Sequence, residues 1–94
     1  MIRIEIIADN AVEDDIMEAL KENGVGSCFT KIPVAHGEGD STPKHGNHIW
    51  PEENFILVIY CERDEAESIR GLIREVKLQF PNEGIKLFEI ESAV

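Results

Sequence analysis

Three histidines lie close together in the sequence and are the side chains best suited to binding a transition metal: His36, His45 and His48. Neutral imidazole is a common ligand of Zn²⁺, Cu²⁺ and Ni²⁺, and carboxylates can complete such a site. Only Gly46 and Asn47 separate His45 from His48, so a turn would bring both rings to one ion. Carboxylates flank the three histidines in the sequence, at Glu38, Asp40, Glu52 and Glu53. The alternatives are that these histidines are simply solvated or that they sense pH.

The other reactive side chains do not form a recognisable catalytic set. Cys28 and Cys61 are too far apart for a CxxC site. We expect Cys28 to be a small buried residue on a strand, and Glu62 beside Cys61 to disfavour its thiolate. No Ser-His-Asp order and no paired carboxylates stand out. The sequence therefore predicts a protein that is not an enzyme.

The histidines belong to a long polar segment, residues 36–51, which reads HGEGDSTPKHGNHIWP. It contains three glycines and two prolines and hardly any apolar residues. Connections longer than about 12–15 residues are uncommon and are often functional. Trp50 is the one bulky apolar residue of the segment, and it either anchors the loop to the protein or docks on a partner. We therefore expect a surface loop with a functional role.

Alternating apolar residues predict the first strand, and the residues after it predict a helix. Ile2, Ile4 and Ile6 recur with a period of two over residues 2–8. Asn10 is a suitable N-cap for a helix over residues 11–23, and Gly24 is suited to end it. A second strand is expected over residues 27–35, where a proline at position 33 predicts a bulge or an edge position.

The second half of the chain repeats the pattern of strand, helix and strand. Residues 55–60 read FILVIY, which suits a strand covered on both faces or buried in a subunit interface. A helix is expected over residues 64–80 and a last strand over 85–91. The helix has an apolar stripe at spacings of three and four, formed by Ala66, Ile69, Ile73, Val76 and Phe80.

This order of elements, βαββαβ, predicts an α+β protein of the ferredoxin-like class. Residues 1–94 would form a single domain, with a four-stranded antiparallel sheet and two helices on one face. Ile7, Phe88, Ile90 and alternate residues of the FILVIY run would then supply apolar side chains to the other face. Association of subunits usually buries such a face, so we expect an oligomer.

The composition excludes several classes of function. The chain has 94 residues, 9 basic and 19 acidic, with a formal net charge of −10. An acidic protein of this kind is a poor ligand for nucleic acid or for anionic membranes. No apolar run approaches about 20 residues, so we expect a cytoplasmic protein without direct membrane insertion. So short a chain has little room for a deep internal site, which favours binding at the surface or between subunits.

Two segments resemble characteristic parts of the PII-like signalling proteins, which belong to the superfamily of nitrogen regulatory protein P-II and CutA. The segment GVGSCFTKIPVAHGEGD, residues 24–40, is similar to the family's second strand and the start of its T-loop. The segment GIKLFEI, residues 84–90, is similar to its last strand, with Lys86, Leu87 and Phe88 in order. The order and length of the elements fit over nearly the whole chain, so the protein resembles a divergent member.

The resemblance implies a homotrimer whose sheets pack into a central core, with ligands in the clefts between subunits. The loop at 36–51 would be the T-loop and would dock on a protein partner such as a transporter or an enzyme. The ligand would be an adenine nucleotide. Its adenine side would lie along Gly26, Ser27 and Cys28. Its phosphates would contact two glycines at the base of the loop and one lysine, namely Gly37, Gly39 and Lys86.

The chain departs from the family at the phosphate loop. Where the family has Gly-Asp-Gly, this chain has Pro81, Asn82, Glu83 and Gly84. Three subunits would carry three times −10, or −30, which favours a monophosphate over a triphosphate. Two hypotheses follow: a trimeric regulator that senses a small ligand, and a metal homeostasis protein that uses the loop histidines to bind a divalent transition metal.

Overall fold

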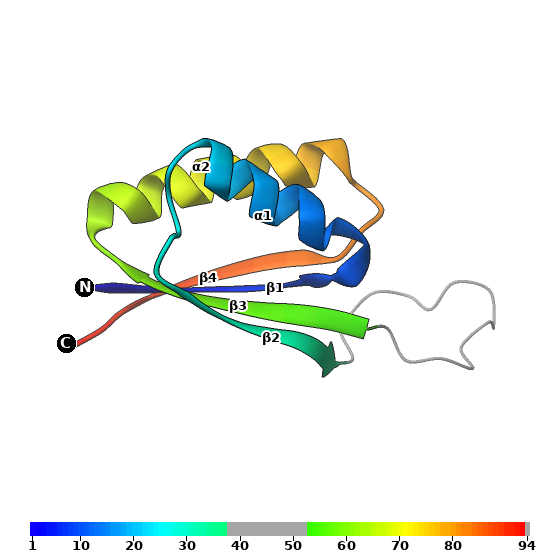
Figure 1. The fold of residues 1–94 in the computed structure, drawn as a ribbon, viewed down its shortest axis with the longest axis horizontal. Helices are drawn as coiled ribbons and strands as arrows, with labels where there is room; N and C mark the ends of the chain where they lie inside the picture. The colour runs from blue at the N-terminus through cyan, green and yellow to red at the C-terminus, as the bar shows by residue number, and fades with distance from the viewer. Residues whose placement is uncertain (38–52, 94) are drawn as a thin grey trace.

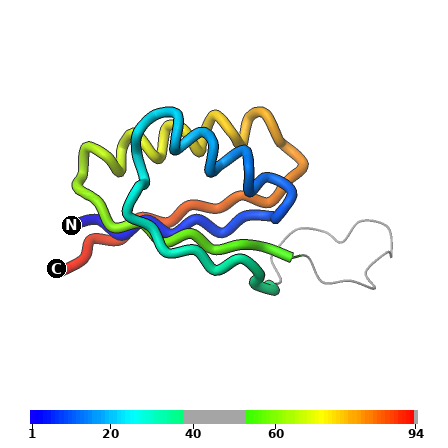
Figure 2. The backbone as a smooth tube through the Cα atoms, viewed as in Figure 1, coloured from blue at the N-terminus to red at the C-terminus, as the bar shows by residue number. Residues whose placement is uncertain are grey.

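A computed structural model describes residues 1–37 and 53–93 of the chain (Figure 1). The sheet has four antiparallel strands in the order β2-β3-β1-β4. Figures 1 and 2 show both helices on one face of this sheet. The expected α+β, ferredoxin-like architecture is therefore confirmed. The elements are β1 Ile2–Asp9, the 3₁₀ helix η1 Asn10–Val12, α1 Glu13–Glu22, β2 Phe29–His36, β3 Glu53–Cys61, α2 Arg63–Gln79 and β4 Ile85–Glu91.

The core lies between the helices and the covered face of the sheet. In β1 every second residue is buried, beginning with Ile2, as the alternation of the sequence predicts. The apolar stripe of α2 faces the same core, with Ile69 and Ile73 almost fully enclosed. Each such isoleucine contributes about 2 kcal/mol through removal from water. Most of the remaining side chains of the core come from α1 and β3, chiefly Ile16, Leu20, Phe55, Leu57 and Ile59.

The first helix begins differently from the prediction. Asp9, not Asn10, supplies the cap, because its Oδ1 accepts a hydrogen bond of 2.8 Å from the backbone N–H of Ala11. That cap starts η1, and α1 follows only at Glu13. The Oδ1 of Asn10 is buried without a hydrogen-bond partner within the described part of the chain. The cap therefore lies one residue earlier than expected because the side chain of an extended Asp9 can reach forward to the first turn.

β2 is an edge strand with an irregularity at the predicted place. Its register against β3 shifts between Ile32 and Ala35, which is a β-bulge. Pro33 has no backbone N–H to donate, and a bulge accommodates it by leaving the extra residue unpaired. The expectation of an edge or bulge at Pro33 is therefore confirmed.

The uncovered side of the sheet is called here the open face. It comprises alternate residues of the strands that do not point to the helices, among them Arg3, Glu5, Ile7, Thr30, Ile32, Asn54, Ile56, Val58, Tyr60, Lys86, Phe88 and Ile90. The FILVIY strand is thus covered on one face only within a single chain. Phe88 and Ile90 are 47% and 54% exposed, so large apolar side chains remain in contact with water there. Within the described ranges no helix is long and apolar enough to cross a membrane.

Candidate functional site

The predicted ligand residues Gly26, Ser27 and Cys28 lie in the connection between α1 and β2. Gly26 is buried, whereas Ser27 and Cys28 are exposed. The expectation that Cys28 is buried on a strand is wrong, because β2 begins only at Phe29 and Cys28 lies in the bend before it. The two side chains are therefore available to a ligand.

Backbone hydrogen bonds fix this connection to the end of α1. The N–H of Gly24 donates to the carbonyl of Lys21 and the N–H of Val25 to that of Leu20, both at 3.1 Å. Gly24 has a φ of 66°, the left-handed conformation that commonly ends helices. The chain therefore leaves α1 along a defined path, and Gly24 ends the helix as predicted.

Gly26 is held more tightly than Gly24. Its φ is 69°, and a Cβ atom there would lie 3.3 Å from Cδ1 of Ile59 and 3.4 Å from Cδ1 of Leu20. Its N–H donates a hydrogen bond of 2.7 Å to Oε2 of Glu65 in the first turn of α2. The sequence gives no signal for this contact, because the two residues are 39 positions apart.

An apolar groove of about 1010 Å³ adjoins this connection. α1 contributes Met17 and Leu20 to its wall, and β2 contributes Phe29, which is 45% exposed. Three charged residues of α1 also line it, namely Glu18, Lys21 and Glu22. Gly26 and Ser27 form part of the same wall. The groove offers apolar surface to a planar or aromatic group next to the predicted ligand residues.

Strand register places Lys86 and Gly37 toward the other end of the sheet, because Lys86 is near the start of β4 and Gly37 follows the last residue of β2. Lys86 is exposed and pairs with Ile7 in β1, and Ile7 in turn pairs with Ile56 in β3. Gly37 is exposed and follows the end of β2. Gly39 lies outside the described residues.

One chain does not bring Lys86 and the Gly26–Cys28 segment together. Phe29, next to that segment, pairs with Ile59, which is three residues along β3 from Ile56. Three residues amount to about 10 Å along a strand, and three strand spacings to about 14 Å across the sheet, or roughly 17 Å in all. A ligand that touches both must therefore lie between two chains or be considerably longer than a nucleoside monophosphate.

The open face carries one satisfied polar cluster within its apolar surroundings. Arg3 Nη2 lies 3.0 Å from Glu5 Oε2, and Arg3 Nη1 donates a 2.7 Å hydrogen bond to the hydroxyl of Tyr60. These bonds, that to Glu5 first, raise the pKa of the Arg3 guanidinium. The charged groups can therefore be covered by another surface while keeping hydrogen-bond partners.

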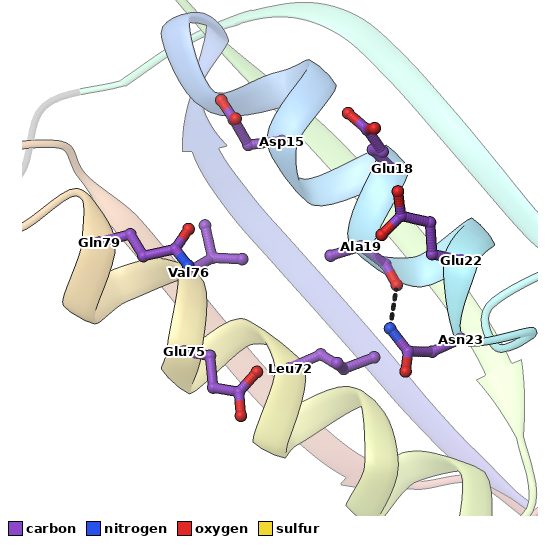
Figure 3. Close-up of a pocket in the computed structure, with 9 residues that line it drawn as sticks. All are labelled: Asp15, Glu18, Ala19, Glu22, Asn23, Leu72, Glu75, Val76 and Gln79. Carbon is purple, nitrogen blue, oxygen red and sulfur yellow. Dashed lines mark hydrogen bonds between the residues drawn. The ribbon is translucent and has the colours of Figure 1, made fainter.

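A second groove, of about 260 Å³, lies between α1 and α2 and contains none of the predicted site residues (Figure 3). Four carboxylates surround it: Asp15, Glu18, Glu22 and Glu75. The amide of Asn23 donates to the carbonyl of Ala19 at its rim. Among the described residues no cationic side chain lines this groove, whereas Lys21 accompanies Glu18 and Glu22 at the apolar groove. The acidic groove therefore repels phosphates and is not a candidate for the nucleotide.

Residues 1–37 and 53–93 give little support to the hypothesis of a metal site. No cluster of three or more His, Cys, Asp or Glu side chains suited to a metal ion occurs there. His36 is exposed at the end of β2, opposite Glu53. His45 and His48 lie outside the described residues, as does Trp50.

No protein-family model and no curated protein matches the sequence. Many solved structures match it, and two of them do so along nearly its whole length. The first is a PII-like signalling protein from Thermus thermophilus, with a TM-score of 0.60, 22% identity and coverage of 95% of this chain and 83% of that one. The second is CPII, a nitrogen regulatory PII-like protein from Thiomonas intermedia bound to ADP, AMP and bicarbonate. It has a TM-score of 0.68 at 12% identity and covers 99% of this chain and 94% of the other.

The chain has the fold of the PII-like signalling proteins. The PII-like fold explains why the strand order, both helices and the position of the 36–51 segment between β2 and β3 agree with the resemblance seen in the sequence. Sequence reasoning missed two contacts of this PII-like fold: that of Glu65 with Gly26 and that of Arg3 with Tyr60.

Proposed function

We propose that the protein is a regulator of the PII type that binds an adenine mono- or diphosphate and signals to a protein partner through residues 36–51. The observation that carries the proposal is the similarity over 99% of the chain to CPII, whose structure holds ADP, AMP and bicarbonate. Residues 1–94 would act as one domain, as a cytoplasmic regulator rather than an enzyme.

The proposed assembly is a homotrimer formed through the open face. Its exposed apolar residues, Phe88 and Ile90 among them, give a reason to associate, and the Arg3–Glu5 pair is already satisfied. The sheets of three chains would then form a common core. In such an assembly Lys86 of one subunit would lie near the Gly26–Cys28 segment of its neighbour, and the ligand would bind between the two subunits.

The proposed site divides the ligand between two groups of residues. Gly26, Ser27, Cys28 and the apolar groove beside them would take the adenine side, and Lys86 with Gly37 and Gly39 the phosphates. The strongly negative protein and the glycine-poor turn at residues 81–84 favour one or two phosphates over three. We therefore expect AMP and ADP to bind more tightly than ATP.

Titration calorimetry tests the proposal with AMP, ADP and ATP, each against the native chain and Lys86→Ala. We expect binding of AMP and ADP at micromolar concentrations, and about tenfold weaker binding in the variant because a charge-assisted contact is lost. Titrations with Zn²⁺, Cu²⁺ and Ni²⁺ are run in parallel. Absence of nucleotide binding, together with metal binding abolished by His45→Ala and His48→Ala, would favour the metal hypothesis instead.

A further inference from the structure

Glu65 connects two parts of the fold that are distant in sequence. It lies in the first turn of α2, directly after β3, and its Oε2 accepts the N–H of Gly26 at 2.7 Å. Negative charge is favoured at this place, because the N-terminal end of a helix carries a partial positive charge. The bond joins a backbone donor to a carboxylate oxygen, and hydrogen bonds to carboxylates are stronger than those between neutral groups.

The bond completes the fixation of the connection that precedes β2. The carbonyls of Leu20 and Lys21 already hold its first half. Beyond Gly26, β2 pairs with β3 from Phe29 onward. Between these two fixed points lie only Ser27 and Cys28, both exposed.

The core side of Gly26 is closely packed. Ile59 and Leu20 lie in contact with the position that its Cβ would occupy. Its N–H is the donor that points to α2, and without an acceptor it would be a buried unpaired group. The side chain of Glu65 thus fixes the position of the backbone from which Ser27 and Cys28 follow.

We propose that Glu65 is the positioning residue of the ligand segment: its carboxylate holds Gly26 so that Ser27 and Cys28 are presented to the adenine side of the ligand. This inference rests on the proposed function for the identity of the ligand. It goes beyond that function by assigning a role to a residue on α2 that does not itself touch the ligand.

The test compares the native chain with Glu65→Ala, Glu65→Gln and, as a matched control, Glu67→Ala on the exposed side of the same helix. Calorimetry is performed with adenosine and with AMP. In Glu65→Ala we expect both dissociation constants to rise about tenfold and by the same factor, because the lost bond is charge-assisted and lies on the adenine side. Lys86→Ala should weaken AMP but leave adenosine unchanged.

Glu65→Gln retains an oxygen that can accept the Gly26 N–H, so it should restore binding to within about threefold of the native chain. Glu67→Ala should bind as the native chain does. If Glu65 only stabilised the fold, Glu65→Ala would lower the stoichiometry of binding while the folded fraction kept its dissociation constants. Unchanged dissociation constants for both compounds would therefore overturn the inference.

Hydrogen exchange of the Gly26 amide gives a readout that needs no ligand. We expect exchange at least tenfold faster in Glu65→Ala and near-native exchange in Glu65→Gln. If the native chain binds none of the adenine compounds, the proposed nucleotide function is overturned. The exchange rates then decide the anchoring role separately: unchanged exchange in Glu65→Ala overturns it, and faster exchange restored by Glu65→Gln supports it.

Discussion

The two cysteines have opposite surroundings. Cys61 ends β3 and is buried against the helices, and burial is the first cause that raises the pKa of its thiol. The nearby carboxylates of Glu65, Glu89 and Glu62 raise that pKa further. Cys28 lies exposed before β2. Because the thiolate is the reactive form, Cys61 should be unreactive at neutral pH for two independent reasons.

We therefore expect one thiol per chain to react with an aromatic disulfide reagent at pH 7.5 in the native protein, and two in denaturant. Cys28→Ser should remove the fast reaction and leave Cys61. Raising the pH should accelerate the reaction of Cys61 only above its ordinary pKa of about 8.5, since its folded pKa is raised. Reaction of both thiols at similar rates in the native protein would contradict the burial of Cys61.

The connection between α1 and β2 contains two glycines in the same backbone conformation but in different surroundings. Both have a positive φ, yet a Cβ at Gly24 would meet nothing within 4 Å, whereas one at Gly26 would press on Ile59. Gly24→Ala should lower the free energy of unfolding by about 1 kcal/mol, the cost of the left-handed conformation. Gly26→Ala should cost at least about 2 kcal/mol, because the contact adds to it. Urea unfolding of both variants gives the comparison, and equal losses would contradict it.

Helix α2 offers a test of which of its faces stabilises the fold. Ile73 is 1% exposed in the core, whereas Leu78 is 77% exposed on the same helix. Ile73→Ala should lower the free energy of unfolding by about 3 kcal/mol, since it removes apolar contacts and leaves a cavity. Leu78→Ala should change it by less than about 0.5 kcal/mol. Comparable losses in the two variants would be inconsistent with this packing.

The elements were predictable because their periodicity corresponds directly to burial. Ile2, Ile4 and Ile6 are buried as the alternation indicates, and the stripe through Ile69 and Ile73 faces the core. The start of α1 could not be predicted in the same way. Two adjacent polar residues, Asp9 and Asn10, can each serve as a cap, and sequence alone does not decide between them.

The site was less predictable than the fold. Lys86 and the Gly26–Cys28 segment were found through a family resemblance, not through any pattern of their own. Their separation depends on strand register, which a run of apolar residues does not specify. The bond between Gly26 and Glu65 depends on how α2 lies over the sheet, and no local rule describes an arrangement of segments so distant in sequence.

At the scale of the whole molecule, the open face should govern association. Phe88 pairs directly with Glu5, so Phe88→Lys places a cation beside a carboxylate and leaves the fold of one chain intact. It removes about 2 kcal/mol of apolar burial per subunit from the proposed interface and adds a charge to it. We expect sedimentation velocity at micromolar concentration to show an oligomer for the native chain and mainly monomer for this variant.

Leu78→Lys, on the helix side of the molecule, is the matched control and should leave the oligomer unchanged. A native chain that sediments as a monomer would contradict association through the open face, and so would a Phe88→Lys variant that sediments as the native chain does.

The bulge in β2 has a consequence for how copies of the chain can meet. A regular edge strand would offer its free N–H and C=O groups to the edge strand of another copy. Such pairing can continue from chain to chain without limit. Pro33 lacks the donor, and the shift of register between Ile32 and Ala35 interrupts the ladder that a neighbour would have to match. At the opposite margin, β4 carries Lys86, Glu89 and Glu91. Both margins thus resist fibrillar growth, so the chain can keep an apolar sheet surface for a closed assembly without the hazard of polymerisation.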